Sequence, residues 1–450
     1  MIDQSTRLHD RMEAGRELFR TSTGLPQPRT TWTERFLLLT SIVILPLQDH
    51  FPPVAGMSIS FIIFAALAVY IILNRPHILG KIWYHPVFCA AYVFIIVSVL
   101  LEFPSPLPRY SETIRFAQMM VGAISIAVLC RDRSALAAGL YGYLAAGLWV
   151  AVLLYATSYG SLQEIDAEDF SEASRARADA FADNPVAANI NGLAFVCVQG
   201  GIVAFALCLS DRLKHLRLQL LAITCFYLIA SFLPMSRGAF MMGLASFAAI
   251  FYTRGIRYGK AVMFACVLGL GIYMLVPDAV WSRMKFSTEV NNGHMESRAK
   301  LYTTALNRLP DYIVFGVGAG NYYGSWGAEN GFAARDHVKG AHNVFIQIAI
   351  FWGLFGLLAY LLILWCVYRA IPLRCGRDEL AVALVGLIVS LGTLLLQSHN
   401  FQDKPFALCV GMLVGARLWI WPTGIVPEVE ASKYPSGAEA QIASLSSSKE

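Results

Sequence analysis

The stretch that decides the fold class is residues 343–367, NVFIQIAIFWGLFGLLAYLLILWCV, which contains no Asp, Glu, Lys or Arg. A helix needs about 20 predominantly apolar residues to cross the hydrocarbon core of a bilayer. Comparable apolar runs, several of them shorter, recur at residues 36–48, 54–73, 86–101, 114–130, 134–157, 186–209, 216–233, 238–253, 261–277, 380–397 and 405–421. Together they predict an all-α polytopic membrane protein with about 12 transmembrane helices.

The composition of the whole chain agrees with a membrane protein. Its 450 residues are 56% hydrophobic and 14% charged, whereas soluble domains carry about 25% charged residues. The charges lie between the apolar runs, because a charge at the bilayer centre costs roughly 3 kcal/mol. The net charge of +5 therefore reflects which loops face the cytoplasm, and we expect a lipid bilayer and no nucleic acid as partner.

The basic residues predict the orientation of the chain in the membrane. If the N-terminus lies in the cytoplasm, the inside loops are all basic, as the positive-inside rule requires; their residues are Arg75, Lys81, Arg131, Arg133, Arg212, Lys214, Arg217, Arg254, Arg257, Lys260, Arg369, Arg374 and Arg377. Each outer turn, at 49–53, 234–237 and 398–404, has at most one basic residue. We expect a cytoplasmic segment 1–35, a membrane domain 36–421 and a disordered cytoplasmic tail 422–450.

Two outer loops are too long to be simple connectors, residues 159–185 and residues 278–340, the latter between spans 9 and 10. In the second loop, residues 297–309 form an amphipathic pattern with a Ser297 cap and with Pro310 directly after it; its apolar positions are Leu301, Ala305 and Leu309. We expect an amphipathic helix over residues 297–309 that lies over the membrane face.

The sequence predicts neither a metal nor a cofactor. Eight of the nine cysteines lie in or at the ends of apolar runs and Cys375 lies in a basic loop, which is no disulfide or zinc pattern. The acidic residues of 164–169 have no spacing that demands a cation, and His337 and His342 are five residues apart rather than four. The segment GVGAGN, residues 316–321, lacks the Lys-Ser/Thr ending of a phosphate loop. We interpret it as a flexible turn.

Two arginines at the outer side could bind a phosphate. Arg237 follows Ser236 at the start of a span, where free N–H groups and the helix dipole favour an anion. A guanidinium binds two phosphate oxygens at once. Arg298 opens the amphipathic segment and could hold diphosphate oxygens together with its basic neighbours. The alternatives are a snorkelling anchor for Arg237 and a solvated helix face for Arg298.

His342 lies at the outer N-terminus of the span that begins at residue 343. The positive end of a helix disfavours a second positive charge, so a neutral imidazole could accept a proton there. That is the requirement for a general base acting on a sugar hydroxyl. The alternative is a structural role at the membrane interface.

An ordered set of short motifs resembles the O-antigen ligase family of bacterial inner-membrane glycosyltransferases, which also contains Wzy-type polysaccharide polymerases. The motifs are DNPVAAN at 183–189, SRGA at 236–239, Arg298 followed by Pro310, FGVGAG at 315–320, HNVFIQ at 342–347 and GLFG at 353–356. The resemblance covers roughly residues 180–370, and the earlier spans only in layout. It implies a GT-C-like glycosyltransferase architecture.

The resemblance also implies an activity and roles for residues. Members of the family transfer a glycan from a polyprenyl (undecaprenyl) diphosphate donor to an acceptor hydroxyl on the periplasmic side, without a nucleotide sugar or a metal. By position, Arg237 and Arg298 would bind the donor diphosphate and His342 would orient or deprotonate the acceptor hydroxyl. Arg175 and Arg177, just before the first motif, are further donor-binding candidates.

The sequence leaves the acceptor open. A ligase would use a sugar of the lipid A core, and a polymerase would use another carrier-linked repeat unit in O-antigen or exopolysaccharide synthesis. The ordered motif set is closest to the ligases, which we therefore favour. A transporter or lipid flippase is the competing class; the spans are almost free of the ionisable groups that ion-coupled transport uses.

Overall fold

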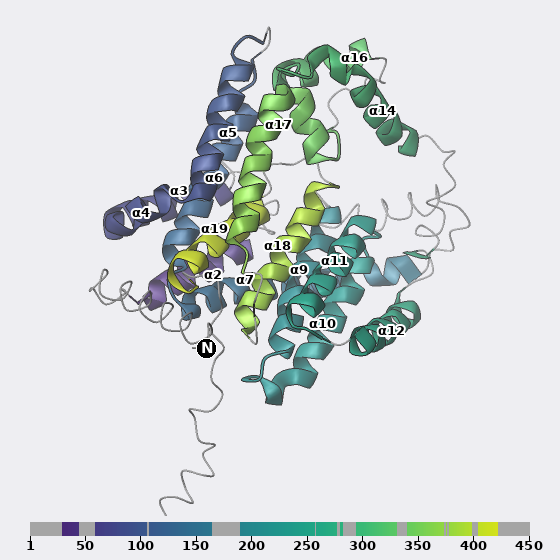
Figure 1. Cartoon of the computed structure of the whole chain (residues 1–450). Helices are drawn as coiled ribbons and strands as arrows, with labels where there is room; N and C mark the ends of the chain where they lie inside the picture. The colour runs from purple at the N-terminus through teal and green to yellow at the C-terminus, as the bar shows by residue number, and fades with distance from the viewer. Residues whose placement is uncertain are drawn as a thin grey trace, which may run out of the picture.

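The computed structural model describes residues 29–44, 59–105, 108–163, 190–256, 258–276, 280–281, 294–330, 340–372, 375, 378–397 and 404–421. In these ranges the regular secondary structure is entirely helical (Figure 1). Each apolar run found in the sequence overlaps one of the helices. The prediction of an all-α protein is therefore confirmed.

The described part of the chain folds into α-helices, one 3-10 helix (η3) and one π-helix (η5). They are α2 (Trp32–Ile44), α3 (Ile59–Asn74), α4 (Pro76–Trp83), α5 (Pro86–Glu102), α6 (Ser111–Leu129), α7 (Arg133–Gln163), α9 (Ile190–Cys208), η3 (Lys214–Leu216), α10 (Arg217–Phe232), α11 (Arg237–Thr253), α12 (Tyr258–Leu275), α14 (His294–Tyr312), α15 (Ala319–Asn321), η5 (Tyr322–Trp326), α16 (Gly327–Glu329), α17 (Val344–Ala370), α18 (Glu379–Leu395) and α19 (Lys404–Trp419).

Among the described residues, five helical segments are long and apolar enough to cross a membrane: α6, α7, α9, Lys214–Phe232 and α17. The pair α3 and α4, bent by 113°, makes a sixth if it is one span. Helices α5 and α18 are apolar but shorter. The chain is thus a polytopic membrane protein.

Small residues let several of these helices approach closely, as is common where helices pack in a membrane. On α19, Gly411 and Gly415 lie against the backbone of α6; a Cβ at Gly415 would be 2.8 Å from the carbonyl oxygen of Ala127. On α7 and α9, Gly147 and Gly200 face each other, and a Cβ at Gly147 would be 3.0 Å from the Cα of its partner. Larger residues here would push the helices apart.

A fully buried carboxylate joins three helix ends. Glu34 in the first turn of α2 is 0% exposed, and it forms ion pairs of 2.8 Å with both Arg75 and Arg131. The predicted first span, 36–48, therefore starts too late, because α2 already begins at Trp32 and buries Glu34 against the two arginines.

Further ion pairs join loops that the sequence placed on the cytoplasmic side. Arg133 pairs with Asp378, and Glu379 lies 3.8 Å from Arg133 and 4.0 Å from Arg212. These loops gather at one end of the molecule, which we call the charged end; it comprises Glu34, Arg75, Arg131, Arg133, Arg212, Asp378 and Glu379.

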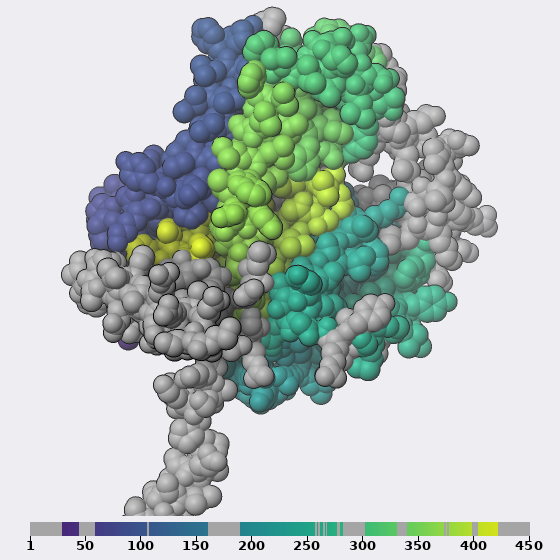
Figure 2. Space-filling view, in the orientation of Figure 1, coloured from purple at the N-terminus to yellow at the C-terminus, as the bar shows by residue number. Residues whose placement is uncertain are grey.

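At the opposite end, α14 and α16 lie near the ends of α5 and α17 (Figure 1). We call this the loop end; it comprises the C-terminus of α5, the segment 294–330 and the N-termini of α11 and α17. In Figure 2 the segment 294–330, in green, forms a continuous surface with the upper part of α17.

Helix α14 is longer than the sequence predicted. We expected residues 297–309, capped by Ser297 and ended by Pro310, but the helix runs from His294 to Tyr312 and contains Pro310. Proline lacks the N–H that would bond one turn back, yet the helix continues to Tyr312, whose hydroxyl donates to the Ala305 carbonyl at 2.8 Å. Ala305 is buried, as expected for the apolar face of this helix.

Helix α17 is broken in its middle, at Trp352 (φ −131°) and Gly353 (φ +59°). The Leu354 N–H donates to Ile313 at 2.6 Å instead of bonding within α17. The carbonyls freed by the break, those of residues 350 and 351, accept the N–H groups of residues 317 and 318 at 2.8 and 2.9 Å. The segment 316–321, which we interpreted as a flexible turn, is thus hydrogen-bonded into the gap of a membrane helix.

Glu102 at the end of α5 fixes the same segment from the other side. This residue is 0% exposed. Its Oε1 accepts the N–H groups of Arg109 (2.8 Å) and Gly320 (3.0 Å), and its Oε2 accepts those of Ala319 (2.9 Å) and the Trp352 indole (3.1 Å). One carboxylate therefore connects α5, the segment 316–321 and the break in α17.

Candidate active site

Arg237 is the first residue of α11, and its side chain is half-buried. Ser236 is the N-cap, and its hydroxyl accepts the N–H of Ala239 at 3.5 Å. The N–H groups at the start of the helix and the positive end of its dipole favour an anion, and Arg237 places a cationic residue at the same helix start.

His342 directly precedes Asn343, the N-cap of α17. The Asn343 side chain accepts two N–H groups of the first turn at 3.0 and 3.1 Å, and its amide donates to the Leu396 carbonyl at 3.3 Å. The carbonyl of His342 accepts the Tyr302 hydroxyl at 3.1 Å. Helices α14, α17 and α18 thus meet around the backbone of His342.

The two site helices begin in the same unusual way. Met235 (φ +52°) and His342 (φ +49°) are the residues other than glycine with positive φ in the described part of the chain. Each lies immediately before the N-cap residue of its helix. A left-handed backbone is costly for such side chains and is found preferentially at functional sites.

The end of α18 contacts both site elements. Leu396 accepts the hydrogen bond from the N-cap of α17, next to His342. The side-chain amide of Gln397 lies against Gly238, next to Arg237, where any side chain would collide with it. The structure therefore brings Arg237 and His342, predicted separately from the sequence, to the same end of one helix.

The other predicted site residues are only partly described. Arg298 lies in α14, about one turn before Tyr302, whose hydroxyl bonds to the His342 carbonyl. The side chain of Arg298 lies outside the described part of the structure, as do Arg175 and Arg177. The backbone position of Arg298 is thus on the helix that contacts His342.

Gln347 is a further candidate site residue. It ends the HNVFIQ motif, but the sequence alone predicted no role for it. It is fully buried in α17, and its Oε1 accepts the N–H of Ala341 at 2.6 Å. Within the described residues its Nε2 has no hydrogen-bond partner. Gln347 holds the backbone immediately before His342. The signal that could have revealed it is an amide inside the uncharged run 343–367, after its first residue, because polar groups inside spans are costly.

Residues 192–361 match a family model described as Wzy_C, O-antigen ligase. The resemblance to the O-antigen ligase family is confirmed. The match covers less than half of the chain, extending from α9 into α17, and it contains Arg237, Arg298 and His342 but neither Arg175 nor Arg177. No protein with a curated description matches the chain.

The matched region contains both helix N-termini of the candidate site and the whole described part of the loop end between α12 and α17. The family indicates a glycosyltransferase-like enzyme of polysaccharide biosynthesis that acts on lipid-linked glycans in a membrane. The parts of the chain before α9 and after α17 lie outside the match.

Proposed function

We propose that the chain is an inner-membrane glycosyltransferase of the O-antigen ligase type. It transfers a glycan from an undecaprenyl-diphosphate donor to a sugar hydroxyl of an acceptor on the periplasmic face. The observation that carries this proposal is that the residues directly after Arg237 and His342 both contact the end of α18, within the region that matches the O-antigen ligases.

The donor diphosphate would bind at the N-terminus of α11. Arg237 would supply a guanidinium at the positive end of the α11 dipole, and Arg298 would contribute a second positive charge from α14. Arg175 and Arg177 are further candidates for the same task. During transfer the bond between the sugar C1 and the phosphate oxygen breaks, and the diphosphate leaves with the bonding electrons. Cationic groups preorganised at that position would stabilise the developing charge.

The acceptor would bind next to His342. Its hydroxyl oxygen forms the new bond to the sugar C1, and its proton passes to the imidazole, which acts as general base. Tyr302 and Gln347 act as positioning residues, because their bonds hold the backbone at His342 and at the residue before it. The lipid A core is the expected acceptor of a ligase.

Substitution of the two central residues tests the proposal. Arg237→Ala and His342→Ala should each lower glycan transfer at least 100-fold, which is the usual range for loss of a transition-state donor or a general base. The controls are Arg212→Ala and His215→Ala, which change the same residue types at the charged end. Arg212 lies just before η3 and His215 lies within it, and both variants should transfer glycan normally. The rate is measured with purified lipid-linked glycan and acceptor. Near-normal transfer by either site variant, inserted at normal levels, refutes its assigned role.

The glycan profile of a deletion strain tests the same activity in the cell. A deletion strain that lacks polymer on its lipopolysaccharide but retains long carrier-linked chains indicates a ligase. A strain that accumulates single repeat units indicates a polymerase, and the ligase proposal would then be wrong.

We further propose about twelve spans, with both termini in the cytoplasm and the loop end in the periplasm, in the GT-C-like layout. The ion pairs that join the predicted inside loops at the charged end support their placement on the same side of the membrane, and the positive-inside rule assigns that side to the cytoplasm. Alkaline phosphatase fused after Asn330 should be active, and the same fusion after Arg212 should be inactive. The reverse pattern excludes the orientation.

A further inference from the structure

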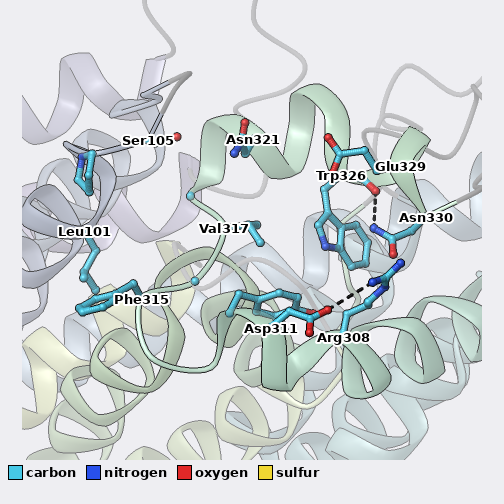
Figure 3. Close-up of a pocket in the computed structure, with 14 residues that line it drawn as sticks. Leu101, Ser105, Arg308, Asp311, Phe315, Val317, Asn321, Trp326, Glu329 and Asn330 are labelled. Atoms are coloured by element: carbon cyan, nitrogen blue, oxygen red, sulfur yellow. Dashed lines mark hydrogen bonds and ion pairs between the residues drawn. The ribbon is translucent and has the colours of Figure 1, made fainter.

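A cavity of about 460 Å³ opens at the loop end. It lies between the end of α5, the end of α14, the segment 315–318 and the short helices that follow (Figure 3). Neither Arg237 nor His342 lines it. Its volume lies within the range of about 300–1,000 Å³ that is typical of small-molecule sites.

The lining combines aromatic rings with amide and charged groups. In Figure 3 the indole of Trp326 lies beside Asn330 and above the pair Arg308 and Asp311. The guanidinium and carboxylate of that pair are 3.3 Å apart. The Asn330 amide donates to the Trp326 carbonyl at 2.8 Å, so the ring and the amide are held together.

The ring itself is rigidly held. Trp326 stacks on Tyr322 with ring centroids 5.2 Å apart and an interplanar angle of 29°. On the neighbouring wall, burial raises the pKa of Tyr312 to about 12, so its hydroxyl stays protonated and keeps its bond to Ala305. A binding surface of this kind is preorganised and loses little side-chain entropy when a ligand binds.

One polar group in the lining lacks a partner. The hydroxyl of Ser105 is buried and has no hydrogen-bond partner within the described residues. Gly318 faces it, and a Cβ there would be 2.8 Å from the Ser105 Oγ. A buried hydroxyl without a partner costs about 1–3 kcal/mol. Because this oxygen has almost no accessible surface, a hydroxyl group of a ligand in the cavity would reach it only after a local shift of the wall at Gly318.

We propose that this cavity is a saccharide-binding subsite that holds a sugar unit of the glycan substrate away from the reacting bond. Flat aromatic rings match the apolar faces of a sugar ring, and amide, carboxylate and guanidinium groups bind its hydroxyls. A lipid tail would find charged and amide groups along the same wall. The assignment of this sugar to the transferred glycan or to the acceptor rests on the proposed function.

The subsite is mechanically connected to the candidate active site. The segment 316–318 lines the cavity and also fills the break in α17, the helix whose N-terminus presents His342. A glycan held at both points would be bound by its diphosphate end at Arg237 and by a distant sugar in the cavity. Binding away from the reacting bond can position the substrate for transfer.

A binding experiment tests the subsite without catalysis. The probes are the core oligosaccharide and the polysaccharide released by mild acid from the surface glycan of the source strain, both free of diphosphate. The full chain is purified in lipid nanodiscs and titrated while ligand signals are followed by saturation-transfer NMR. We expect saturable binding of one fraction; binding of the polysaccharide identifies the donor glycan, and binding of the core identifies the acceptor.

Two asparagines provide a matched pair of variants. Asn321 lines the cavity, whereas Asn307 is exposed on α14 and does not. Asn321→Ala should weaken saccharide binding about tenfold, the equivalent of one hydrogen bond, and Asn307→Ala should bind normally. Equal affinities for the two variants, or no binding of either fraction by the unmodified chain, overturn the subsite.

The subsite and the proposed function can fail separately. Arg237→Ala should bind the released saccharide normally, because the probe has no diphosphate. If the unmodified chain transfers no glycan but Asn321→Ala still selectively weakens binding, the proposed function is wrong and the subsite stands. If transfer is normal but Asn321→Ala binds as tightly as the unmodified chain, the subsite is wrong and the proposed function stands.

Discussion

Glu102 provides the most direct test of how the loop end is held together. In Glu102→Gln one carboxylate oxygen becomes an NH2 group, which cannot accept a hydrogen bond. Because each oxygen accepts two N–H groups in the structure, the variant leaves two buried donors without an acceptor. Each unsatisfied donor costs about 1–3 kcal/mol. We therefore expect the variant to destabilise the contact between the segment 316–321, α5 and α17 by about 2–6 kcal/mol.

This loss should appear as local opening rather than global unfolding, because the charged end is held by separate contacts. Hydrogen exchange followed by mass spectrometry measures it directly. A loss of about 2 kcal/mol raises the open population about thirtyfold, so amides of residues 317–320 should exchange at least that much faster in Glu102→Gln. Peptides covering residues 128–136 at the charged end should be unchanged.

The control is Glu329→Gln, the same isosteric change at an exposed carboxylate of the loop end. It should leave exchange in residues 317–320 as in the unmodified chain. If Glu102→Gln also leaves exchange there unchanged, the carboxylate does not hold the segment and the reasoning is wrong.

Two other predictions concern stability. Gly353→Ala should lower the melting temperature, because φ is +59° and a Cβ would overlap a backbone carbonyl, whereas Gly392→Ala in α18, with nothing within 4 Å, should leave it unchanged or raise it. Burial raises the pKa of Asp132, but hydrogen bonds from Thr30 and the charge of Arg35 outweigh this and lower it below its usual value. Its stabilisation is complete above about pH 4 and is lost as the pH falls through the lower folded-state pKa; melting curves between pH 3 and 7 should therefore show a weaker acid dependence for Asp132→Asn.

Hydropathy predicts the helices of this protein well because lipid imposes a simple rule on their composition. Errors arise where tertiary contacts decide. Helix α2 starts before its apolar run because Glu34 is buried by two arginines from other helices. Helix α14 also passes through Pro310 and ends at Tyr312. The ion pairs of Glu34 cannot be read from local sequence, because their partners lie on other helices.

The candidate site likewise combines features that the local sequence predicts with contacts that it does not predict. Arg237 and His342 could be predicted because each lies at a helix N-terminus, a local feature with known electrostatics. Their meeting at the end of α18 could not, since it depends on packing. Glu102 was missed altogether: its partners Ala319 and Gly320 lie more than two hundred residues away in the sequence. In the sequence, an acidic residue at the end of an apolar run also looks like any other charged residue at a membrane boundary, so Glu102 did not stand out.

The break in α17 has a consequence for chimeric proteins. A loop that donates its backbone N–H groups to a membrane helix is not a separate module. Exchanging residues 294–330 alone between relatives, in order to exchange glycan preference, would place a foreign segment in a gap shaped for this one. A functional graft would have to include the end of α5 with Glu102 and the first half of α17. To exchange glycan preference, one would therefore have to exchange parts of the membrane helices together with the loop.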